Sequence, residues 1–206
     1  MEAYRQDEIS AGLPLQSERV ALRLMRRDDV DAMGHWPFYL DPFFSRASRM
    51  PTTKMGKDNW WRNNFNPPYW VMLAAENRRT GQLIGRVTIT LVDKPGGEGV
   101  MGVRIKPNLE SKGYGTEMIR LFLEYWFIHR EMEILTFDAN ALNRQALRCY
   151  EKVGIDPVGY HYEYLPQYTS EAEAHPSGFF KFIDFRLTRD QYLRTLRLVS
   201  LVSIEA

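Results

Sequence analysis

The chain has 206 residues, of which 44% are hydrophobic and 13% aromatic. This length and composition suit one folded domain with a packed core and exclude general disorder. The formal net charge of +1 provides no overall attraction to nucleic acid or to a membrane surface. The single cysteine, Cys149, excludes an internal disulfide and a cysteine-based zinc site and is typical of a reducing compartment.

The hydropathy pattern gives no sign of export or membrane insertion. No apolar run approaches the length that spans a bilayer, and residues 1–8 carry charges where a signal peptide would be apolar. We therefore expect a cytoplasmic protein with no nucleic-acid partner, no membrane partner and no metal. The sequence leaves open whether two copies form a homodimer.

The first third of the chain predicts an arm, a strand and two helices. Residues 1–18 show no regular pattern and are expected to form an unpacked N-terminal arm. Alternating hydrophobic residues predict a strand over residues 19–25. Asp28 or Asp29 is expected to cap a short helix, and a second helix is expected over residues 55–65.

The rest of the chain predicts a meander followed by helices and strands. Three β-rich segments are separated by short turns, which is typical of antiparallel neighbours; they cover residues 69–75, 82–92 and 98–105. The elements expected after them are a long amphipathic helix at 113–130, a strand at 132–138, a helix from Asn143 to Gly154, and strands at 156–164 and 179–187.

This order of elements predicts an α/β (α+β) fold. Residues 19–187 are expected to form a single domain with a mixed, mainly antiparallel sheet of six to seven strands flanked by helices. Residues 188–206 are expected to form a helical C-terminal tail.

The loop Glu110-Ser111-Lys112-Gly113-Tyr114-Gly115 lies between an expected strand and the start of the long helix. Unpaired backbone N–H groups and the positive end of the helix dipole converge there, which favours a bound diphosphate. The chain lacks the Gly-x-x-x-x-Gly-Lys-Ser/Thr pattern of a P-loop. A dinucleotide-binding turn is disfavoured, because Met118 stands at the third glycine position and residues 106–112 separate the strand from the first glycine.

Two segments of the chain resemble the GNAT N-acetyltransferases. Gly113-Tyr114-Gly115-Thr116-Glu117 is similar to the family's acetyl-CoA loop, Gln/Arg-x-x-Gly-x-Gly/Ala. Asn143-Arg144-Gln145-Ala146-Leu147-Arg148-Cys149-Tyr150-Glu151-Lys152-Val153-Gly154-Ile155 is similar to its more specific signature, Asn-x-x-Ala-x-x-x-Tyr-Glu-Lys-x-Gly-Phe. The resemblance covers residues 19–187 in element order. Within the family, the layout is similar to the subgroup that includes the ribosomal-protein N-terminal (alanine/serine) acetyltransferases.

The resemblance implies roles for particular residues. Its cofactor-binding set consists of the strand backbone at Val103, Arg104 and Ile105, the loop residues Ser111, Lys112, Gly113, Tyr114, Gly115 and Thr116, and the side chains of Asn143 and Tyr150. Tyr150 is also implied as the general acid that protonates the leaving thiolate. Glu98 is a candidate catalytic base or else a solvated residue, and His161 and Tyr162 are the alternatives for the base.

Three residues bear on how well the family pattern applies. Glu110 stands where the family usually has Gln or Arg, so we expect its side chain to point to solvent and Lys112 to supply the missing positive charge. Cys149 lacks a positioned histidine that would activate it, so we expect it to be buried rather than to act as a nucleophile.

The implied activity is transfer of acetyl from acetyl-CoA to a primary amine, by direct attack in a ternary complex. The acceptor is expected to enter between the first two helices and the loop at residues 165–178. A protein N-terminus is the first expectation for the acceptor, from the subgroup resemblance. A small-molecule amine such as an aminoglycoside, a polyamine or a siderophore precursor is the alternative. A non-catalytic acyl-CoA-binding module is the alternative from another functional class.

Overall fold

The computed structural model describes residues 9–39, 49–65, 70–92, 97–166 and 178–202. Its elements are, in chain order, β1 (Leu15–Gln16), β2 (Val20–Leu24), α2 (Arg27–Met33), α4 (Lys54–Asn64), β3 (Trp70–Asn77), β4 (Leu83–Val92), β5 (Glu98–Ile105), the 3-10 turn η1 (Pro107–Leu109), α5 (Tyr114–Glu124), the π-helical turn η2 (Tyr125–His129), β6 (Ile134–Asn140), α6 (Arg144–Lys152), β7 (Pro157–Tyr164), β8 (Phe179–Thr188) and α7 (Arg189–Val202). No helix in these ranges is both long enough and apolar enough to cross a bilayer.

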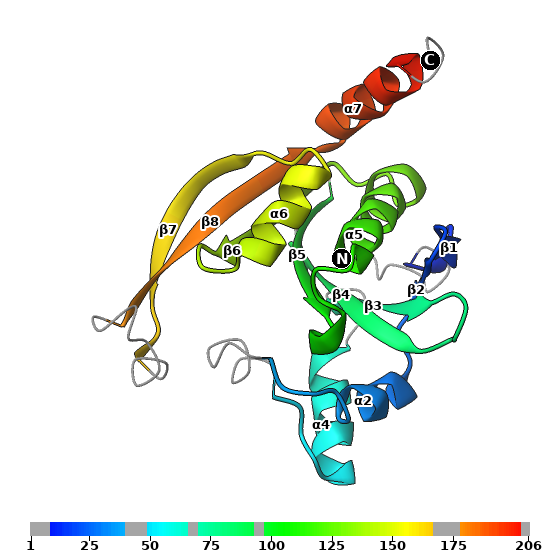
Figure 1. Ribbon diagram of the computed structural model, residues 1–206, viewed down its shortest axis with the longest axis vertical. Helices are drawn as coiled ribbons and strands as arrows, with labels where there is room; N and C mark the ends of the chain where they lie inside the picture. The colour runs from blue at the N-terminus through cyan, green and yellow to red at the C-terminus, as the bar shows by residue number, and fades with distance from the viewer. Residues whose placement is uncertain (1–8, 40–48, 66–69, 93–96, 167–177, 203–206) are drawn as a thin grey trace.

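The predicted α/β fold with one mainly antiparallel sheet is confirmed. Eight strands form the sheet in the order β1-β2-β3-β4-β5-β6-β8-β7, and the β5–β6 pair is parallel (Figure 1). The sheet has more strands than the expected six to seven, because the short strand β1 pairs antiparallel with β2. That extra strand lies inside the segment expected to be an unpacked arm.

The centre of the sheet is forked. β5 and β6 pair only through Glu98↔Ile134, Gly99↔Leu135 and Val100↔Thr136, and they diverge beyond these residues. On its other side β5 stays paired with β4 along its whole length, up to Ile105. Figure 1 shows β6, β8 and β7 bending away from the other strands. Within the described ranges, one edge of β5 therefore has no neighbouring strand over residues 101–105.

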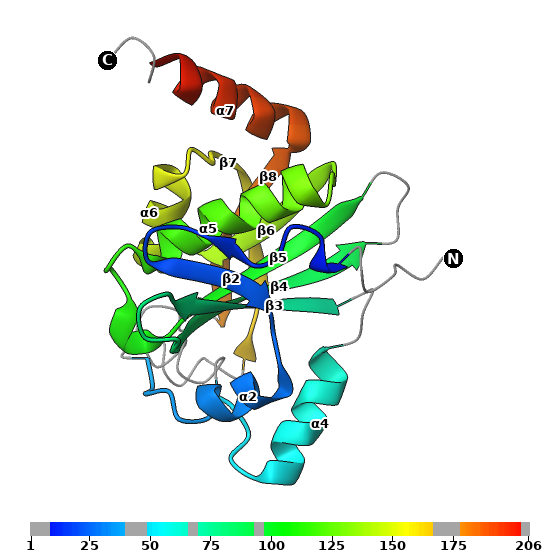
Figure 2. The ribbon, with the colours of Figure 1, turned by 90° about the vertical axis from the view of Figure 1, so that its right-hand side faces the viewer.

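Helices cover the two faces of the sheet differently. Helices α5 and α6 lie on one face, over the main core, in which Phe122 and Trp126 are fully buried (Figure 2). Helices α2 and α4 lie on the opposite face, where Val30 and Met33 of α2 pack with Met72 of β3. The two faces thus carry separate hydrophobic clusters, and the main cluster has strand residues on both sides of the fork, such as Met101 of β5 and Leu135 of β6.

Two local expectations for the first third of the chain are wrong. The side chain of Ile9 is only 2% exposed, and its backbone oxygen accepts a hydrogen bond of 2.7 Å from the Tyr125 hydroxyl. The described part of the expected arm is therefore packed, because its apolar side chains are buried in the main core. Arg26, rather than Asp28 or Asp29, is the N-cap of α2, and Asp29 accepts from the Arg26 N–H at 2.6 Å from within the first turn.

Candidate active site

A cleft of about 490 Å³ opens at the fork, between β5, the glycine loop, α5, β6 and α6. Most of the expected cofactor residues line it, namely Val103, Arg104, Ile105, Ser111, Gly113, Gly115, Thr116, Asn143 and Tyr150. Lys112, Tyr114 and Glu98 do not line it. Residues that are far apart in the sequence therefore meet where the two strands separate.

The glycine loop has a conformation that turns backbone donors toward this cleft. Ser111 and Gly113 both have positive φ angles, of 59° and 86°, and Gly113 is the N-cap of α5. The first N–H groups of a helix have no intrahelical acceptor, and successive amides in such a turn form an anion-binding concavity. A Cβ atom at Gly113 would lie 2.8 Å from Nη2 of Arg19, and one at Gly115 would lie 3.2 Å from Sγ of Cys149. The left-handed φ of Gly113 favours glycine at that position, and a Cβ atom at either glycine would require the neighbouring side chain to shift.

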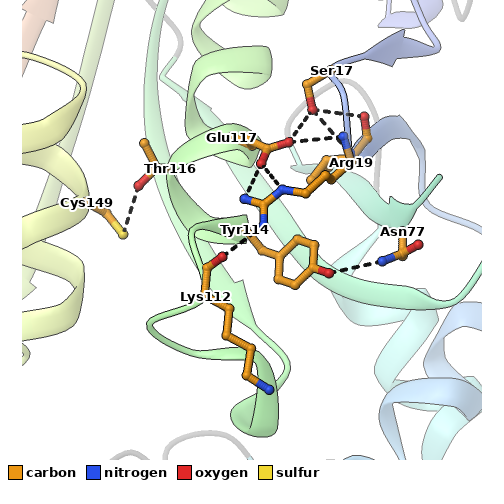
Figure 3. A network of polar contacts seen from close by, with 9 residues as sticks. Ser17, Arg19, Asn77, Lys112, Tyr114, Thr116, Glu117 and Cys149 are labelled. Carbon is orange, nitrogen blue, oxygen red and sulfur yellow. Dashed lines mark hydrogen bonds and ion pairs between the residues drawn. The ribbon is translucent and has the colours of Figure 1, made fainter. Parts of the chain in front are cut away.

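An ion pair fastens the loop to the N-terminal part of the chain (Figure 3). The Arg19 guanidinium pairs with the Glu117 carboxylate and donates to the Lys112 carbonyl oxygen at 3.1 Å. The Ser17 hydroxyl donates to the same carboxylate at 2.7 Å. These contacts lower the pKa of Glu117, although partial burial opposes them. Glu117 therefore stays ionised and fixes the first turn of α5 against β2.

The expectation that Glu110 points to solvent is wrong. Its half-buried side chain lines the cleft, and burial raises the pKa of its carboxyl group. The ammonium group of Lys112 donates to the Asn108 carbonyl oxygen at 2.9 Å, on the exposed side of the loop. Lys112 therefore does not offset the carboxylate in the cleft, whose lining also includes the cationic residues Arg104, Arg148 and Lys152.

Helix α6 contributes Asn143 and Tyr150 to the opposite wall. The Asn143 side chain caps α6 by accepting from the Ala146 N–H at 3.0 Å. Tyr150 is 6% exposed and packs between Phe137 and Phe185, with ring centroids 4.7 and 4.9 Å from its own. Burial raises the pKa of Tyr150 well above its usual value, so its hydroxyl keeps its proton at neutral pH.

The cysteine on this helix packs against the loop. Cys149 is partly buried, and its sulfur accepts a hydrogen bond of 3.7 Å from the Thr116 hydroxyl, as Figure 3 shows. Among the described residues, no group of three or more His, Cys, Asp and Glu side chains is arranged to hold a metal.

The candidate bases chosen from the sequence lie away from the cleft. Glu98 is at the paired end of β5, five residues before Val103, which corresponds to roughly 17 Å along a strand. His161 lies on β7, where Nδ1 is 2.6 Å from Oδ1 of Asp184, and this carboxylate raises the pKa of the imidazole. Tyr162 lies on the same strand and is exposed.

The carboxylates that the described structure brings to the cleft are Glu110 and Asp138. Partial withdrawal from water raises the pKa of Asp138. The charge of His161 opposes this effect, and the like charges of Glu163 and Asp184 add to it. Asp138 was not among the candidate bases predicted from the sequence. Its place near the end of the strand that follows the long helix could have indicated that it reaches the cleft.

A second cavity, of about 540 Å³, adjoins the cleft on the side of α2. It is lined by the end of α2 and the chain after it, by residues 49–52, and by Arg104 and Pro107. Tyr39 and Arg104 line both spaces, and the Tyr39 hydroxyl donates to the Ile105 carbonyl oxygen at 2.5 Å. Residues 167–177 of the loop expected to flank the acceptor lie outside the described residues.

Comparisons with known proteins agree with this geometry. A family model described as an acetyltransferase (GNAT) domain matches residues 19–156. A search of curated proteins found no match. The spermidine/spermine N-acetyltransferase SpeG from Vibrio cholerae, in complex with manganese ions, has a TM-score of 0.65 at 16% identity, over 86% of this chain and 96% of that chain. An acetyltransferase (GNAT family) from Bacillus anthracis has a TM-score of 0.62 at 16% identity, over 85% and 98%. At these identities the structural likeness shows a shared fold.

Proposed function

We propose that this chain, which belongs to the GNAT acetyltransferase family, transfers an acetyl group from acetyl-CoA directly to a primary amine in the cleft at the fork. The observation that carries the proposal is the meeting of the unpaired edge of β5 with the N-terminus of α5. A long ligand with an anionic end and an amide-containing arm fits such a site. Acetyl-CoA is that ligand, and it supplies the acetyl thioester.

The two parts of the cofactor are assigned to two parts of the cleft. The diphosphate belongs at residues 111–116, where amides and the α5 dipole favour a negative charge. The pantetheine arm belongs along Val103, Arg104 and Ile105, because β5 has backbone groups there that β6 does not pair. An extended ligand binds such an edge as an added strand does, through main-chain hydrogen bonds.

Two proton transfers are assigned to residues of the cleft. We assign the protonation of the departing sulfur to Tyr150, because Tyr150 lines the cleft and keeps its proton at neutral pH. The attacking amine must first lose a proton, and Glu110 and Asp138 are the carboxylates that reach the cleft. Their raised pKa values make each a stronger base than an ordinary carboxylate. Glu98 could act at the cleft only through a chain of water molecules, given its place on the strand.

The acceptor is assigned to the cavity that adjoins the cleft at Tyr39 and Arg104. A protein N-terminus is the first candidate, on the resemblance to the ribosomal-protein subgroup. A small-molecule amine is the second candidate, since the solved structures that share this fold include spermidine/spermine N-acetyltransferases.

The decisive experiment measures thiol release from acetyl-CoA with a panel of amines. The panel contains peptides that begin with Ala or Ser, spermidine, an aminoglycoside and free amino acids. Release with at least one of these amines, together with the acetylated product seen by mass spectrometry, would support the proposal. Tight acetyl-CoA binding without transfer to any amine would instead assign the chain as an acyl-CoA-binding module.

A further inference from the structure

Two arginines face each other on the acceptor side of the sheet. Arg86 of β4 and Arg104 of β5 are direct cross-strand partners, on the face that α2 and α4 cover. Directly opposed side chains in an antiparallel pair lie close together, and like charges in such positions destabilise the sheet. A pair of this kind needs compensation from an anion.

The described part of the chain gives Arg86 no such anion. Its Nε atom is buried and has no hydrogen-bond partner there, and Nη1 donates to the thioether sulfur of Met72 at 3.5 Å. The guanidinium lies over the ring of Trp60, 5.0 Å from its centroid. Burial, and secondly the charge of Arg104, lowers the pKa of Arg86 to about 9, so the group is still charged at neutral pH.

The 540 Å³ cavity beside this pair is also basic. Of the described residues that line it, Arg49 and Arg104 are charged and none is acidic. Trp36, Phe38 and Met50 give it apolar walls. The lining of the adjoining cleft instead carries both signs of charge, from the carboxylates of Glu110 and Asp138 and from the cations of Arg104, Arg148 and Lys152. The two connected spaces therefore differ in that, among the described residues, carboxylates line only the cleft, and Arg104 lies at their junction.

We infer that the acceptor is an amine that also carries an anionic group, a carboxylate or a phosphate, which Arg104 binds in the basic cavity with support from Arg86 and Arg49. The guanidinium fork of arginine suits the planar or tetrahedral oxygens of such groups. The amine of the acceptor then points past Tyr39 into the cleft, where the carboxylates attract it. A polyamine would place positive charge against the arginines and is disfavoured. The inference rests on the proposed function only in that the amine of the bound acceptor becomes acetylated.

The first test measures anion binding without turnover. Wild-type protein saturated with CoA is titrated with the N-acetyl derivatives of alanine, leucine, phenylalanine and glutamate, each beside its uncharged carboxamide, and with N-acetyl-phosphoethanolamine. At least one anionic probe is expected to bind ten times or more tightly than its uncharged analogue. Arg104→Gln and Arg86→Met are each expected to raise the Kd of that probe at least fivefold. Arg79→Gln, at an exposed turn, is the matched control and should change nothing.

The second test measures turnover with the free amines of the same probes and with spermidine. Selective anion binding together with acetylation of the anionic amines would support both the inference and the proposed function. Selective anion binding without acetyl transfer would support the anion site and refute the proposed function. The inference would be refuted, with the proposed function unaffected, if carboxamides or spermidine were acetylated as efficiently as the anionic amines. In that case Arg104→Gln would not change the ratio of the acetylation efficiencies for the two classes of amine. Failure of every anionic probe to bind would also overturn the inference.

Discussion

Replacing Arg86 by methionine should make the ligand-free protein more stable. At pH 7 the guanidinium is charged in both the folded and the unfolded chain, so the full cost of burying it is present. A lowering of its pKa to about 9 corresponds to roughly 4 to 5 kcal/mol, at about 1.4 kcal/mol for each factor of ten in proton affinity. This cost persists below about pH 9 and is relieved as the pH rises through that value toward the pKa of an exposed arginine.

Methionine keeps an unbranched apolar stem but loses the stacking on Trp60, a contribution of about 1 kcal/mol. The expected net gain is therefore about 3 to 4 kcal/mol, at the upper end of the range measured when buried ionic groups are replaced by apolar ones. For a domain of this size that gain raises Tm by about 6 to 16 °C.

The assay is urea unfolding of the ligand-free Arg86→Met variant at pH 7, with Arg79→Met at an exposed turn as the control. The control should stay within about 0.5 kcal/mol of the wild type. A variant equal to or less stable than the wild type would show that the charge of Arg86 is already compensated. That result would remove the physical basis for an anion site beside Arg104.

Three further substitutions test the cleft. Gly113→Val should raise the Kd for acetyl-CoA at least 100-fold while circular dichroism shows an intact fold. The reason is that valine is strained at the left-handed φ of this position and its Cβ atom would contact Arg19. Unchanged affinity would reject the loop as the cofactor site. Tyr150→Phe should lower kcat tenfold or more with less than a threefold change in acetyl-CoA affinity, and an unchanged kcat would restrict Tyr150 to packing. Glu110→Gln should tighten acetyl-CoA binding about three- to tenfold at pH 8 by calorimetry. Because burial raises the pKa of Glu110, wild-type affinity should approach that of the variant as the pH falls through that pKa, and parallel pH profiles would contradict this account.

The parts of the site that depend on neighbouring residues were predictable from the sequence. The bounds of β5 match the expected strand, residues 98–105, because turn-forming residue types precede and follow this segment in the sequence. Asn143 is the N-cap of α6, and an N-cap requires only an acceptor three residues before an N–H group. Gly154 has a positive φ of 77° just after α6, as expected of a residue that ends a helix.

The parts that depend on strand register were not predictable. Glu98 and Val103 belong to one strand, and only the short pairing of β5 with β6 decides which of them faces the cleft. The opposition of Arg86 and Arg104 likewise follows from the β4–β5 register across a hairpin. Glu110 was expected in solvent because a carboxylate that faces a diphosphate is unfavourable, but the fork makes this loop a wall of the cleft. Such positions are set by long-range packing, which local periodicity does not encode.

The long helix shows an intermediate case. Hydrophobic periodicity predicted a helix over residues 113–130, and the chain is helical there to His129. From Tyr125 onward it is a π-helical turn, which buries three successive aromatic residues, Tyr125, Trp126 and Phe127. Three adjacent side chains do not share one narrow buried face of an α-helix. The π-helical turn contains one residue more than an α-helical turn, and this extra residue lets all three aromatic side chains reach the core.

Ser17 and Arg19 hold the first turn of α5 and the glycine loop in place. If acetyl-CoA binds at this loop, its affinity is therefore coupled to the docking of residues 17–19. If release of residues 17–19 from Glu117 weakens the loop by some factor, bound acetyl-CoA must oppose that release by the same factor. A protease that cleaves in this segment would then act as a reporter of ligand occupancy some 100 residues further along the chain. Saturating acetyl-CoA should slow such cleavage, and removal of the segment should cost affinity in equal measure.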